Sequence, residues 1–420
     1  MTMIQKIKGT MDLLPLDTEL FRKIEGVMRE ESARYGYGEI RTPMFERTEL
    51  FVRGVGEGTD VVQKEMYTWA DKDDSSISLR PEGTASVVRA LIEHGKFSDT
   101  MPQKYYYIGS FFRHEAPQAG RSREFFQFGT ELFGSSAPTA DATAIALASA
   151  VFRRLGLEKT VRLHLNSIGC PHCRPAYREA LVAYYKQHEE TLCDTCRSRL
   201  AKNPLRLLDC KSPICHALAE NAPKTVDYLC PECDTHFSAL KGLLDEMGVD
   251  YVVDSGIVRG LDYYTRTVFE FIAEGIAAQS TVCGGGRYDG LVSSLGGPEM
   301  PAVGFGMGIT RVILALQQAE IPAPTIPSPL LYIAALGQAA GQKAAVMTEA
   351  LRRQGVYAEC DVVGRSLKAQ MKYANKTGAK YVLMLGDSEL ESGVAMLRNM
   401  EDSTQSEIAI ADVVQRMLNA

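Results

Sequence analysis

Residues 105–134 read YYYIGSFFRHEAPQAGRSREFFQFGTELFG, and the rest of the chain is organised around this stretch. Its pattern predicts two strands joined by a long charged loop. Side chains alternate between the two faces of a strand. Arg113, Gln127 and Glu131 are therefore expected to project from the same side of one hairpin.

The pattern by itself leaves two interpretations open. One is an ordinary amphipathic hairpin with a solvated loop. The other is a polar pocket, because an arginine, a glutamine and a glutamate alternate with glycine and aromatic residues on one strand face. In the second interpretation, Gly109 and Gly129 form a floor that leaves room for a ligand against the backbone.

The string FRHE, followed by a loop and then R-x-R-x-F-x-Q-x-G-x-E, resembles the second signature motif of class II aminoacyl-tRNA synthetases, and specifically that of histidyl-tRNA synthetases. The resemblance implies an α+β fold. Its parts are an antiparallel sheet flanked by helices, an inserted module and a C-terminal α/β anticodon-binding domain. It also implies ATP-dependent attachment of L-histidine to its cognate tRNA through histidyl-adenylate. ATP is then a substrate, Mg²⁺ is the metal cofactor, and a homodimer is expected.

The run V-R-G-L-D-Y-Y-T-R-T at residues 258–267 is the most specific motif in the chain. Without any resemblance, Arg259 would be interpreted as a surface arginine at a turn. The run matches the signature of histidyl-tRNA synthetases at each position. That match implies that Arg259 contacts the histidine carboxylate and the α-phosphate, and that Tyr263 and Tyr264 line the histidine pocket.

The segment RPEGT at residues 80–84 joins a predicted strand to a predicted helix. From the residues alone, Thr84 is interpreted as a helix cap. In the family this segment holds the α-amino group of histidine. A carboxylate such as that of Glu82 is a suitable acceptor for an ammonium group.

Residues 301–317, PAVGFGMGITRVILALQ, predict a strand that turns into a helix at Gly308. The segment resembles the third class II motif. In that motif an arginine, which corresponds to Arg311, binds the γ-phosphate of ATP. A helix N-terminus adds a favourable dipole for that anion. The sequence departs from the family at Thr310, where an acidic residue is common, and at Ala116 in the loop that faces tRNA.

The site implied by the resemblance is built mainly from arginines, because adenylation brings a carboxylate against a phosphate. Arginine suits this role since its planar fork donates two hydrogen bonds and keeps its charge. No covalent nucleophile is required. The catalytic residues are Arg259 and Arg113, the ATP-binding residues are Arg113, Arg121 and Arg311, and the histidine-binding residues are Glu82, Gly83, Thr84, Gln127, Glu131, Arg259, Tyr263, Tyr264 and Tyr288.

Eight of the ten cysteines lie between residues 170 and 233. The pairs Cys193/Cys196 and Cys230/Cys233 have the spacing of zinc ligands, and Cys210 and Cys215 are nearby. The pattern alone leaves structural zinc and reduced thiols open. Metal is not part of what the family shares, so no metal ligand is assigned.

Composition indicates a soluble globular protein of two or three domains: 420 residues, 45% hydrophobic, 23% charged and a net charge of −6. No signal peptide or membrane-spanning run is recognised, so a cytoplasmic location is expected. The predicted division is a catalytic domain over residues 1–169 and 250–321, a Cys-rich insertion over 170–249, a Pro-rich linker over 322–329 and an anticodon-binding domain over 330–420.

The sequence leaves two rival functions open. One is a synthetase paralogue that regulates histidine biosynthesis without catalysis. The other is a sensor of histidine or RNA. Both are disfavoured because the signature around Arg259 is intact and a C-terminal domain follows Pro322. In that domain Lys368, Lys372 and Lys376 share one helix face, which is either solvated or an RNA contact.

Overall fold

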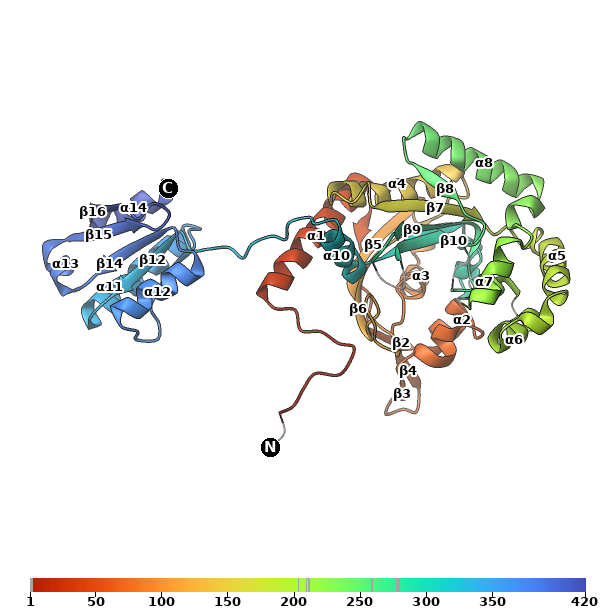
Figure 1. Cartoon of the computed structure of the whole chain (residues 1–420), viewed down its shortest axis with the longest axis horizontal. Coiled ribbons are helices and arrows are strands. Elements are labelled where there is room, and N and C mark those ends of the chain that lie inside the picture. Colours follow the sequence, from red (N-terminus) through yellow and green to blue (C-terminus); the bar gives the residue numbers. More distant parts are fainter. Residues whose placement is uncertain (1–2, 203, 209, 211, 258–259, 277–279) are drawn as a thin grey trace. The chain divides into compact units, whose positions relative to one another are not determined.

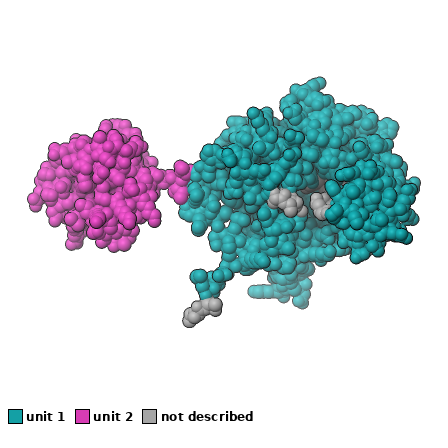
Figure 2. All heavy atoms as spheres, viewed as in Figure 1, with its two compact units in different colours: residues 1–324 teal, residues 325–420 magenta. Residues whose placement is uncertain are grey.

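The computed structural model describes every residue except 1–2, 203, 209, 211, 258–259 and 277–279, and it leaves the side chain of residue 202 undescribed (Figure 1). The chain folds into two compact units, Met1–Pro324 and Thr325–Ala420 (Figure 2). The boundary falls inside the stretch of closely spaced prolines. Proline fixes the backbone and cannot donate to a helix or a sheet, which explains why neither kind of element crosses this boundary.

An eight-stranded sheet forms the centre of the first unit, in the order β1-β5-β6-β11-β10-β9-β7-β8. Its inner pairs are antiparallel, whereas the two edge pairs, β1 with β5 and β7 with β8, are parallel. This is the flanked antiparallel sheet that the resemblance implied. The strands are β1 (Gly38–Glu39), β5 (Gln103–Phe112), β6 (Glu124–Phe133), β7 (Val161–Ser167), β8 (Tyr251–Val253), β9 (Thr265–Ala273), β10 (Thr281–Arg287) and β11 (Ala302–Gly308).

Helices cover both faces of this sheet, because its strands alternate apolar side chains to either side. One face packs against α1 (Pro15–Arg34), α4 (Pro138–Arg154), α8 (Pro231–Glu246) and α10 (Ile309–Gln318). The other packs against α3 (Thr84–Glu93) and α9 (Leu291–Ser294). The neighbours Leu132 and Phe133 illustrate the alternation, since they belong to the two opposite cores.

A small three-stranded sheet and one helix complete the part of this unit that lies outside the Cys-rich insertion. The sheet has the order β2-β4-β3 and consists of β2 (Phe45–Arg47), β3 (Thr68–Ala70) and β4 (Ser76–Leu79), and the helix is α2 (Thr48–Val55). Strands β3 and β4 pair antiparallel.

The Cys-rich insertion is helical. It contains α5 (Arg174–Lys186), α6 (Asp194–Lys202), α7 (Pro213–Glu220) and the start of α8, which lie together in Figure 1. Its apolar core includes Tyr177, Leu181 and Tyr185 from α5. Short 3₁₀ turns cover Lys96–Ser98, Glu189–Thr191, Pro204–Leu207, Thr225–Tyr228 and Ile410–Asp412, and a π-helical turn covers Val61–Glu65.

The second unit is a five-stranded α/β sheet in the order β13-β12-β14-β15-β16. Its strands are β12 (Leu331–Ala335), β13 (Ala358–Cys360), β14 (Tyr381–Leu385), β15 (Val394–Asn399) and β16 (Gln405–Ala409). Its helices are α11 (Gln338–Arg353), α12 (Leu367–Thr377), α13 (Asp387–Ser392) and α14 (Val413–Leu418). The last two strands form an antiparallel hairpin that the sequence analysis did not predict.

Candidate functional site

The long hairpin that was predicted from residues 105–134 is β5 paired with β6. Tyr107 lies opposite Gly129, and Gly109 lies opposite Gln127. On its other side β6 pairs with β11, where Gly304 lies opposite Glu131. The hairpin therefore lies inside the sheet. On its polar face Glu131 is buried, whereas Arg113 and Gln127 are half-buried.

Glu131 is the centre of a buried polar cluster. Its carboxyl group is 1% exposed and accepts hydrogen bonds from Thr84 Oγ1 at 2.7 Å and from the Tyr107 hydroxyl at 3.3 Å. The Tyr288 hydroxyl donates a further short hydrogen bond to the other carboxyl oxygen. Three separate segments, the start of α3, β5 and the residue after β10, thus direct hydroxyl groups at one carboxyl.

The environment of Glu131 suppresses its negative charge. Burial raises the pKa of Glu131 to about 8, although the hydrogen bonds from Tyr288 and Thr84 offset part of that rise. At neutral pH the carboxyl is therefore mostly protonated in this structure. A ligand that brings an N–H donor or a positive charge would favour the carboxylate form.

Glycines around this cluster make room for protein side chains. Tyr107 packs directly over the backbone of Gly129 and Gly83, where any Cβ would collide with its ring. Arg80 occupies the corresponding space at Gly109. The prediction that Gly109 and Gly129 form an open floor for a ligand is therefore wrong.

Glu82 and Thr84 meet at the start of α3, where Glu82 rather than Thr84 caps the helix. The Glu82 carboxylate accepts the backbone N–H groups of Thr84 and Ala85, each at 2.8 Å, and so caps the helix. Burial raises the pKa of Glu82. Thr84 was interpreted as the cap; its hydroxyl instead donates to Glu131.

Aromatic rings pack beside the Glu131 cluster. The ring centroids of Tyr263 and Tyr264 are 4.7 Å apart, and those of Tyr263 and Tyr288 are 5.6 Å apart. Gln127 extends from β6 toward the Tyr107 hydroxyl, at 3.4 Å. The signature tyrosines and the hairpin residues thus lie in one place, although they are more than 130 residues apart in the sequence.

Three arginines lie beside a cavity of about 650 Å³ that adjoins this cluster. Arg121 Nε is 3.2 Å from Glu115 Oε2, and Arg113 Nη1 is 3.8 Å from Glu115 Oε1. Arg311, at the start of α10, donates to the carbonyls of Gly120 at 3.0 Å and Thr281 at 2.7 Å. Burial, and then the neighbouring charge of Arg121, lowers the pKa of Arg311.

The cavity is suited to a polyanion with an extended shape. Positive charge from Arg113, Arg121 and Arg311 lines it. The carboxylates among its described lining residues are those of Glu115, Asp254 and Glu270. Glycines of β10 and β11, at positions 284, 306 and 308, are among the lining residues, so backbone rather than side chain borders the cavity there. Phosphate groups bind to such sets of guanidinium groups through paired hydrogen bonds.

Arg259 lies outside the described residues, so its role stays a prediction. Its neighbours Ile257, Gly260 and Leu261 line the same cavity. The Gly260 carbonyl accepts a hydrogen bond from Arg206 of the insertion at 2.8 Å.

The sequence analysis did not assign Tyr107, Glu115 or Glu270 to the site. Tyr107 could have been found, since it alternates onto the face that carries Gln127 and Glu131. Glu270 lies on β9, and its carboxylate accepts the Thr281 hydroxyl at 2.7 Å. Its place in the cavity depends on strand order, which the sequence pattern does not reveal.

Family models and sequence relatives of this chain all point to the same family of proteins. The family model described as "Histidyl-tRNA synthetase" matches residues 9–312, and that described as "Anticodon binding domain" matches residues 331–420. A histidine–tRNA ligase from Desulforamulus reducens is 49% identical over 407 residues, which cover 97% of this chain and 97% of the relative. A histidine–tRNA ligase from Caldanaerobacter subterraneus is 50% identical over 412 residues, which cover 98% of this chain and 99% of the relative.

A solved structure agrees with these relatives. The apo crystal structure of S. aureus histidyl-tRNA synthetase superposes with a TM-score of 0.83 at 37% identity, covering 99% of this chain and 100% of that one. Within the part of the chain that the structure describes, no helix is both long and apolar enough to cross a membrane.

Proposed function

The chain belongs to the histidyl-tRNA synthetase family, and from this membership we propose how its residues share the reaction. The protein is an aminoacyl-tRNA ligase that uses ATP to attach histidine to tRNA. In the first step a histidine carboxylate oxygen attacks the α-phosphorus of ATP, and the bond to pyrophosphate breaks. In the second step the 3′-terminal ribose hydroxyl of the tRNA attacks the activated carbonyl, and AMP leaves.

The observation that carries the residue assignment is the buried Glu131 cluster. Glu131 accepts the ring N–H of the substrate imidazole, and its carboxylate form is favoured by that donor. Tyr107, Tyr264 and Tyr288 surround the ring. An apolar amino acid of similar size would leave these buried polar groups unpaired, so it is rejected by roughly 10⁴-fold or more.

The α-amino group of histidine is held by Glu82, Thr84 and Gln127. The Glu82 carboxylate already accepts two backbone N–H groups. A carboxylate offers about four acceptor positions, so an ammonium group can still be bound. Gly83, between Glu82 and Thr84, keeps this segment close to the ring of Tyr107.

Arg113 and Arg259 neutralise the histidine carboxylate and the α-phosphate as the two anions approach each other. Arg311 and Arg121 bind the terminal phosphates. These roles require preorganised positive charge and no covalent intermediate with the protein. The support is the convergence of Arg113, Arg121 and Arg311 on one cavity.

Mg²⁺ accompanies ATP in this proposal. Oxygen ligands from carboxylates and phosphates are those that Mg²⁺ prefers, and Glu115 and Glu270 line the cavity near the three arginines. The bound ion neutralises charge on the phosphates. Glu115 already pairs with Arg113 and Arg121, so it also holds those two guanidinium groups in position.

The second unit binds the anticodon arm of the tRNA, with the exposed lysines of α12 as phosphate contacts. The active form is a homodimer, and the exposed side chains of Met44 and Phe45, 53% and 57% accessible, are available for its interface. The location is the cytoplasm, where ATP and tRNA meet. A regulatory paralogue is the weaker alternative because it does not need Arg113, Arg121 and Arg311 together.

Calorimetric titration of histidine into the wild type and the Glu131→Gln variant tests the pocket assignment. The wild type is expected to bind histidine, and the variant to bind it at least tenfold more weakly, with ATP affinity unchanged. Phenylalanine is the matched ligand without ring N–H groups and is expected not to bind. Equal histidine affinity in the two proteins would contradict the assignment.

A further inference from the structure

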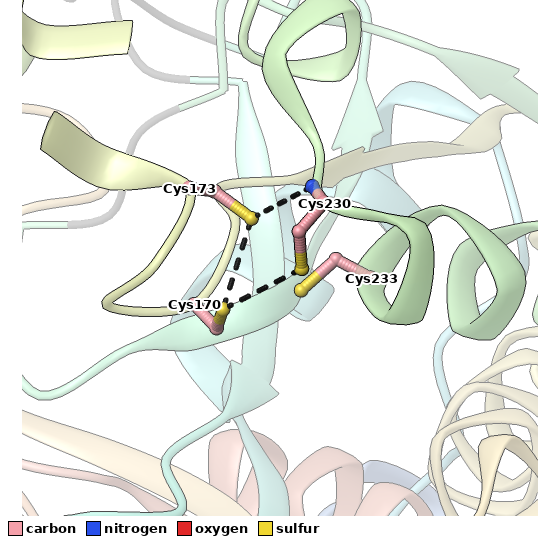
Figure 3. Close-up of side chains that lie close together, drawn as sticks. All are labelled: Cys170, Cys173, Cys230 and Cys233. Carbon is pink, nitrogen blue, oxygen red and sulfur yellow. Dashed lines mark hydrogen bonds between the residues drawn. The ribbon is translucent and has the colours of Figure 1, made fainter. Parts of the chain in front are cut away.

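Eight cysteines of the insertion form two separate groups of four. In each group the sulfur atoms all lie within 4.8 Å of one another. We name them the root cluster, at the base of the insertion (Figure 3), and the outer cluster, within its helices. The root cluster is Cys170, Cys173, Cys230 and Cys233, and the outer cluster is Cys193, Cys196, Cys210 and Cys215.

The sulfur separations match those around a single tetrahedral metal ion. Cys170 Sγ is 3.7 Å from Cys173 Sγ and 3.9 Å from Cys230 Sγ, and Cys193 Sγ is 3.9 Å from Cys210 Sγ. With metal–sulfur bonds of about 2.3 Å, tetrahedral geometry places the sulfurs about 3.8 Å apart. None of the eight clustered cysteines forms a disulfide. We propose that each cluster binds one structural Zn²⁺ through four thiolates.

The backbone around each cluster supports thiolate ligands. The backbone N–H of Cys230 donates to Cys173 Sγ at 3.1 Å, and that of Cys193 donates to Cys215 Sγ at 3.4 Å. Hydrogen bonds of this kind orient and stabilise metal ligands. Gly169 precedes the root cluster with φ +67°, and a Cβ there would lie 2.6 Å from the Cys173 Cβ. Glycine thus allows this ligand loop to close tightly.

The alternative is that these cysteines are ordinary core residues, because a free cysteine packs like a small apolar side chain. That alternative explains their burial but not their grouping. In the root cluster, one C-x-x-C pair follows β7 and the other begins α8, so two distant chain segments bring their sulfurs to one point (Figure 3). The outer cluster likewise joins two pairs, Cys193/Cys196 and the wider-spaced Cys210/Cys215, with no cysteine of the insertion left over.

The ligand set also selects the ion and its role. Four sulfur ligands in a tetrahedral arrangement favour zinc or iron over magnesium or calcium. Separations below 4.8 Å leave space for one ion rather than for a cluster of several irons. Four protein ligands complete the tetrahedral coordination of zinc and leave no coordination position for a substrate. These ions would therefore have a structural role.

The ions would stabilise a module that has a small core. Helices α6 and α7 have only 9 and 8 residues, and short helices are marginal without tertiary support. Small modules commonly compensate for a limited core with metal ions or disulfides. The outer cluster places Cys196 and Cys215, both 0% exposed, at the centre of that core.

The root cluster adjoins residues that contact the segment lining the histidine pocket. Next to Cys173, Arg174 donates a short hydrogen bond to the Tyr264 carbonyl. Between Cys230 and Cys233, Glu232 forms an ion pair of 2.6 Å with Arg266. This link to the pocket rests on the proposed function; the zinc content does not.

The outer cluster contacts the same segment through Arg206, which lies between Cys196 and Cys210. Arg206 donates to the Gly260 carbonyl at 2.8 Å. Its guanidinium is also 3.6 Å from Asp60 and 3.9 Å from Asp262. Loss of the outer zinc is therefore expected to loosen the connection between the insertion and the pocket.

Elemental analysis of the full-length protein, purified without chelators or a metal-binding tag, tests the proposal. The wild type is expected to contain two zinc ions per chain, one for each cluster, and less than about 0.2 iron. The double variant Cys193→Ser/Cys196→Ser is expected to retain only the root zinc, and Cys230→Ser/Cys233→Ser only the outer one. Cys360→Ser, which changes a cysteine outside both clusters, is expected to keep both ions.

A second measurement does not depend on whether the variants fold. Titrating the native wild type with a mercurial reagent, in the presence of a zinc-sensitive dye, is expected to release zinc in proportion to the clustered thiols that react. A zinc content below about 0.2 per chain, or iron in place of zinc, would overturn the proposal. The proposal would also be overturned if the amount of zinc released did not increase with the number of modified thiols but correlated instead with histidine-dependent activity.

Discussion

At the scale of single residues, Glu131 makes the stability of the protein depend on pH. Its folded-state pKa is raised to about 8 by burial. A raised pKa means that the stability contribution is fully present below the unfolded-state pKa and decreases as pH rises through the folded-state value. Between about pH 5 and about pH 8, ligand-free wild type should therefore become less stable by a few kcal/mol relative to Glu131→Gln.

Urea denaturation of both proteins at several pH values measures this difference. The only tryptophan, Trp69, lies in the first unit, so its fluorescence reports on the unit that contains Glu131. Parallel pH profiles for the wild type and Glu131→Gln would show that Glu131 does not titrate in this window.

Arg259 is predicted to act on the rate of adenylation. Removing one charge-stabilising donor costs on the order of 10² in rate, so Arg259→Ala should slow adenylation by about that factor, with a smaller effect on ATP affinity. Arg259→Lys keeps the positive charge but lacks the planar guanidinium group. Its adenylation rate should therefore lie between those of the wild type and Arg259→Ala. Quench-flow measurement of histidyl-adenylate formation distinguishes them.

The control for this series is Arg22→Ala, which removes an exposed arginine of α1 that pairs with Glu19. It should adenylate at the wild-type rate. If Arg259→Ala also remains within about threefold of the wild type, a change far smaller than the loss of one such donor, the assignment taken from the signature motif fails.

At the scale of elements, a fully buried ion pair ties β10 to α4. Arg287 and Asp141 are both 0% exposed and form a short two-point contact, and His236 of α8 lies 3.3 Å from Asp141. Removing Asp141 leaves the buried Arg287 charge with only the partly exposed Asp289 as an ion-pair partner, and breaking a buried pair costs about 3–5 kcal/mol. Asp141→Ala should destabilise the first unit by that amount in urea denaturation.

The comparison variant is Asp289→Ala, which removes the partly exposed partner of the same arginine at 3.1 Å. Its destabilisation should be clearly smaller, because solvent screens an exposed charge. Equal destabilisation of the two variants would mean that burial does not determine the strength of these ion pairs.

Helix α12 of the second unit carries a stripe of positive charge. Lys368, Lys372 and Lys376 are all exposed. Removing one ion pair between a lysine and a tRNA phosphate should reduce the salt dependence of tRNA binding by about one unit of slope. The triple change to glutamate should therefore weaken tRNA binding and flatten its salt dependence, with histidine adenylation unchanged.

Filter binding of tRNA at several salt concentrations checks this prediction. Lys343→Glu alters an exposed lysine on α11 of the same unit and serves as the control. If it weakens binding as much per charge as the α12 changes do, the effect is one of net charge rather than of a specific surface.

Much of the fold could be predicted from local patterns. The alternation along β5 and β6 correctly gave one polar face, and the boundary at Gly308 between β11 and α10 agreed with the structure. Helix α1 starts at Pro15, and the Asp17 carboxylate in its first turn accepts the Leu14 N–H at 3.0 Å. Patterns with periods of two and 3.6 residues depend only on neighbours along the chain.

What the sequence did not reveal depends on contacts between distant segments. The pairing of the C-x-x-C after β7 with the one before α8, and the filling of Gly109 and Gly129 by Arg80 and Tyr107, follow from the three-dimensional arrangement alone. The hairpin of β15 and β16 was missed because exposed edge strands carry few apolar residues.

At the scale of the whole molecule, the chain folds into two compact units, and the proposed function divides the reaction between them. The first contains the described residues proposed to form histidyl-adenylate, and the second resembles an anticodon-binding domain. Since no proposed residue of the adenylation step belongs to the second unit, the first step should proceed without tRNA.

The most direct test of the histidine pocket is ATP–pyrophosphate exchange, without tRNA, in the presence of each standard amino acid in turn. We predict exchange with histidine alone, because only an imidazole pairs with the buried Glu131 cluster while its carboxylate meets the arginines. Exchange driven by another amino acid would contradict the histidine pocket. The absence of exchange with a protein that still binds histidine would contradict catalysis and indicate a regulatory paralogue.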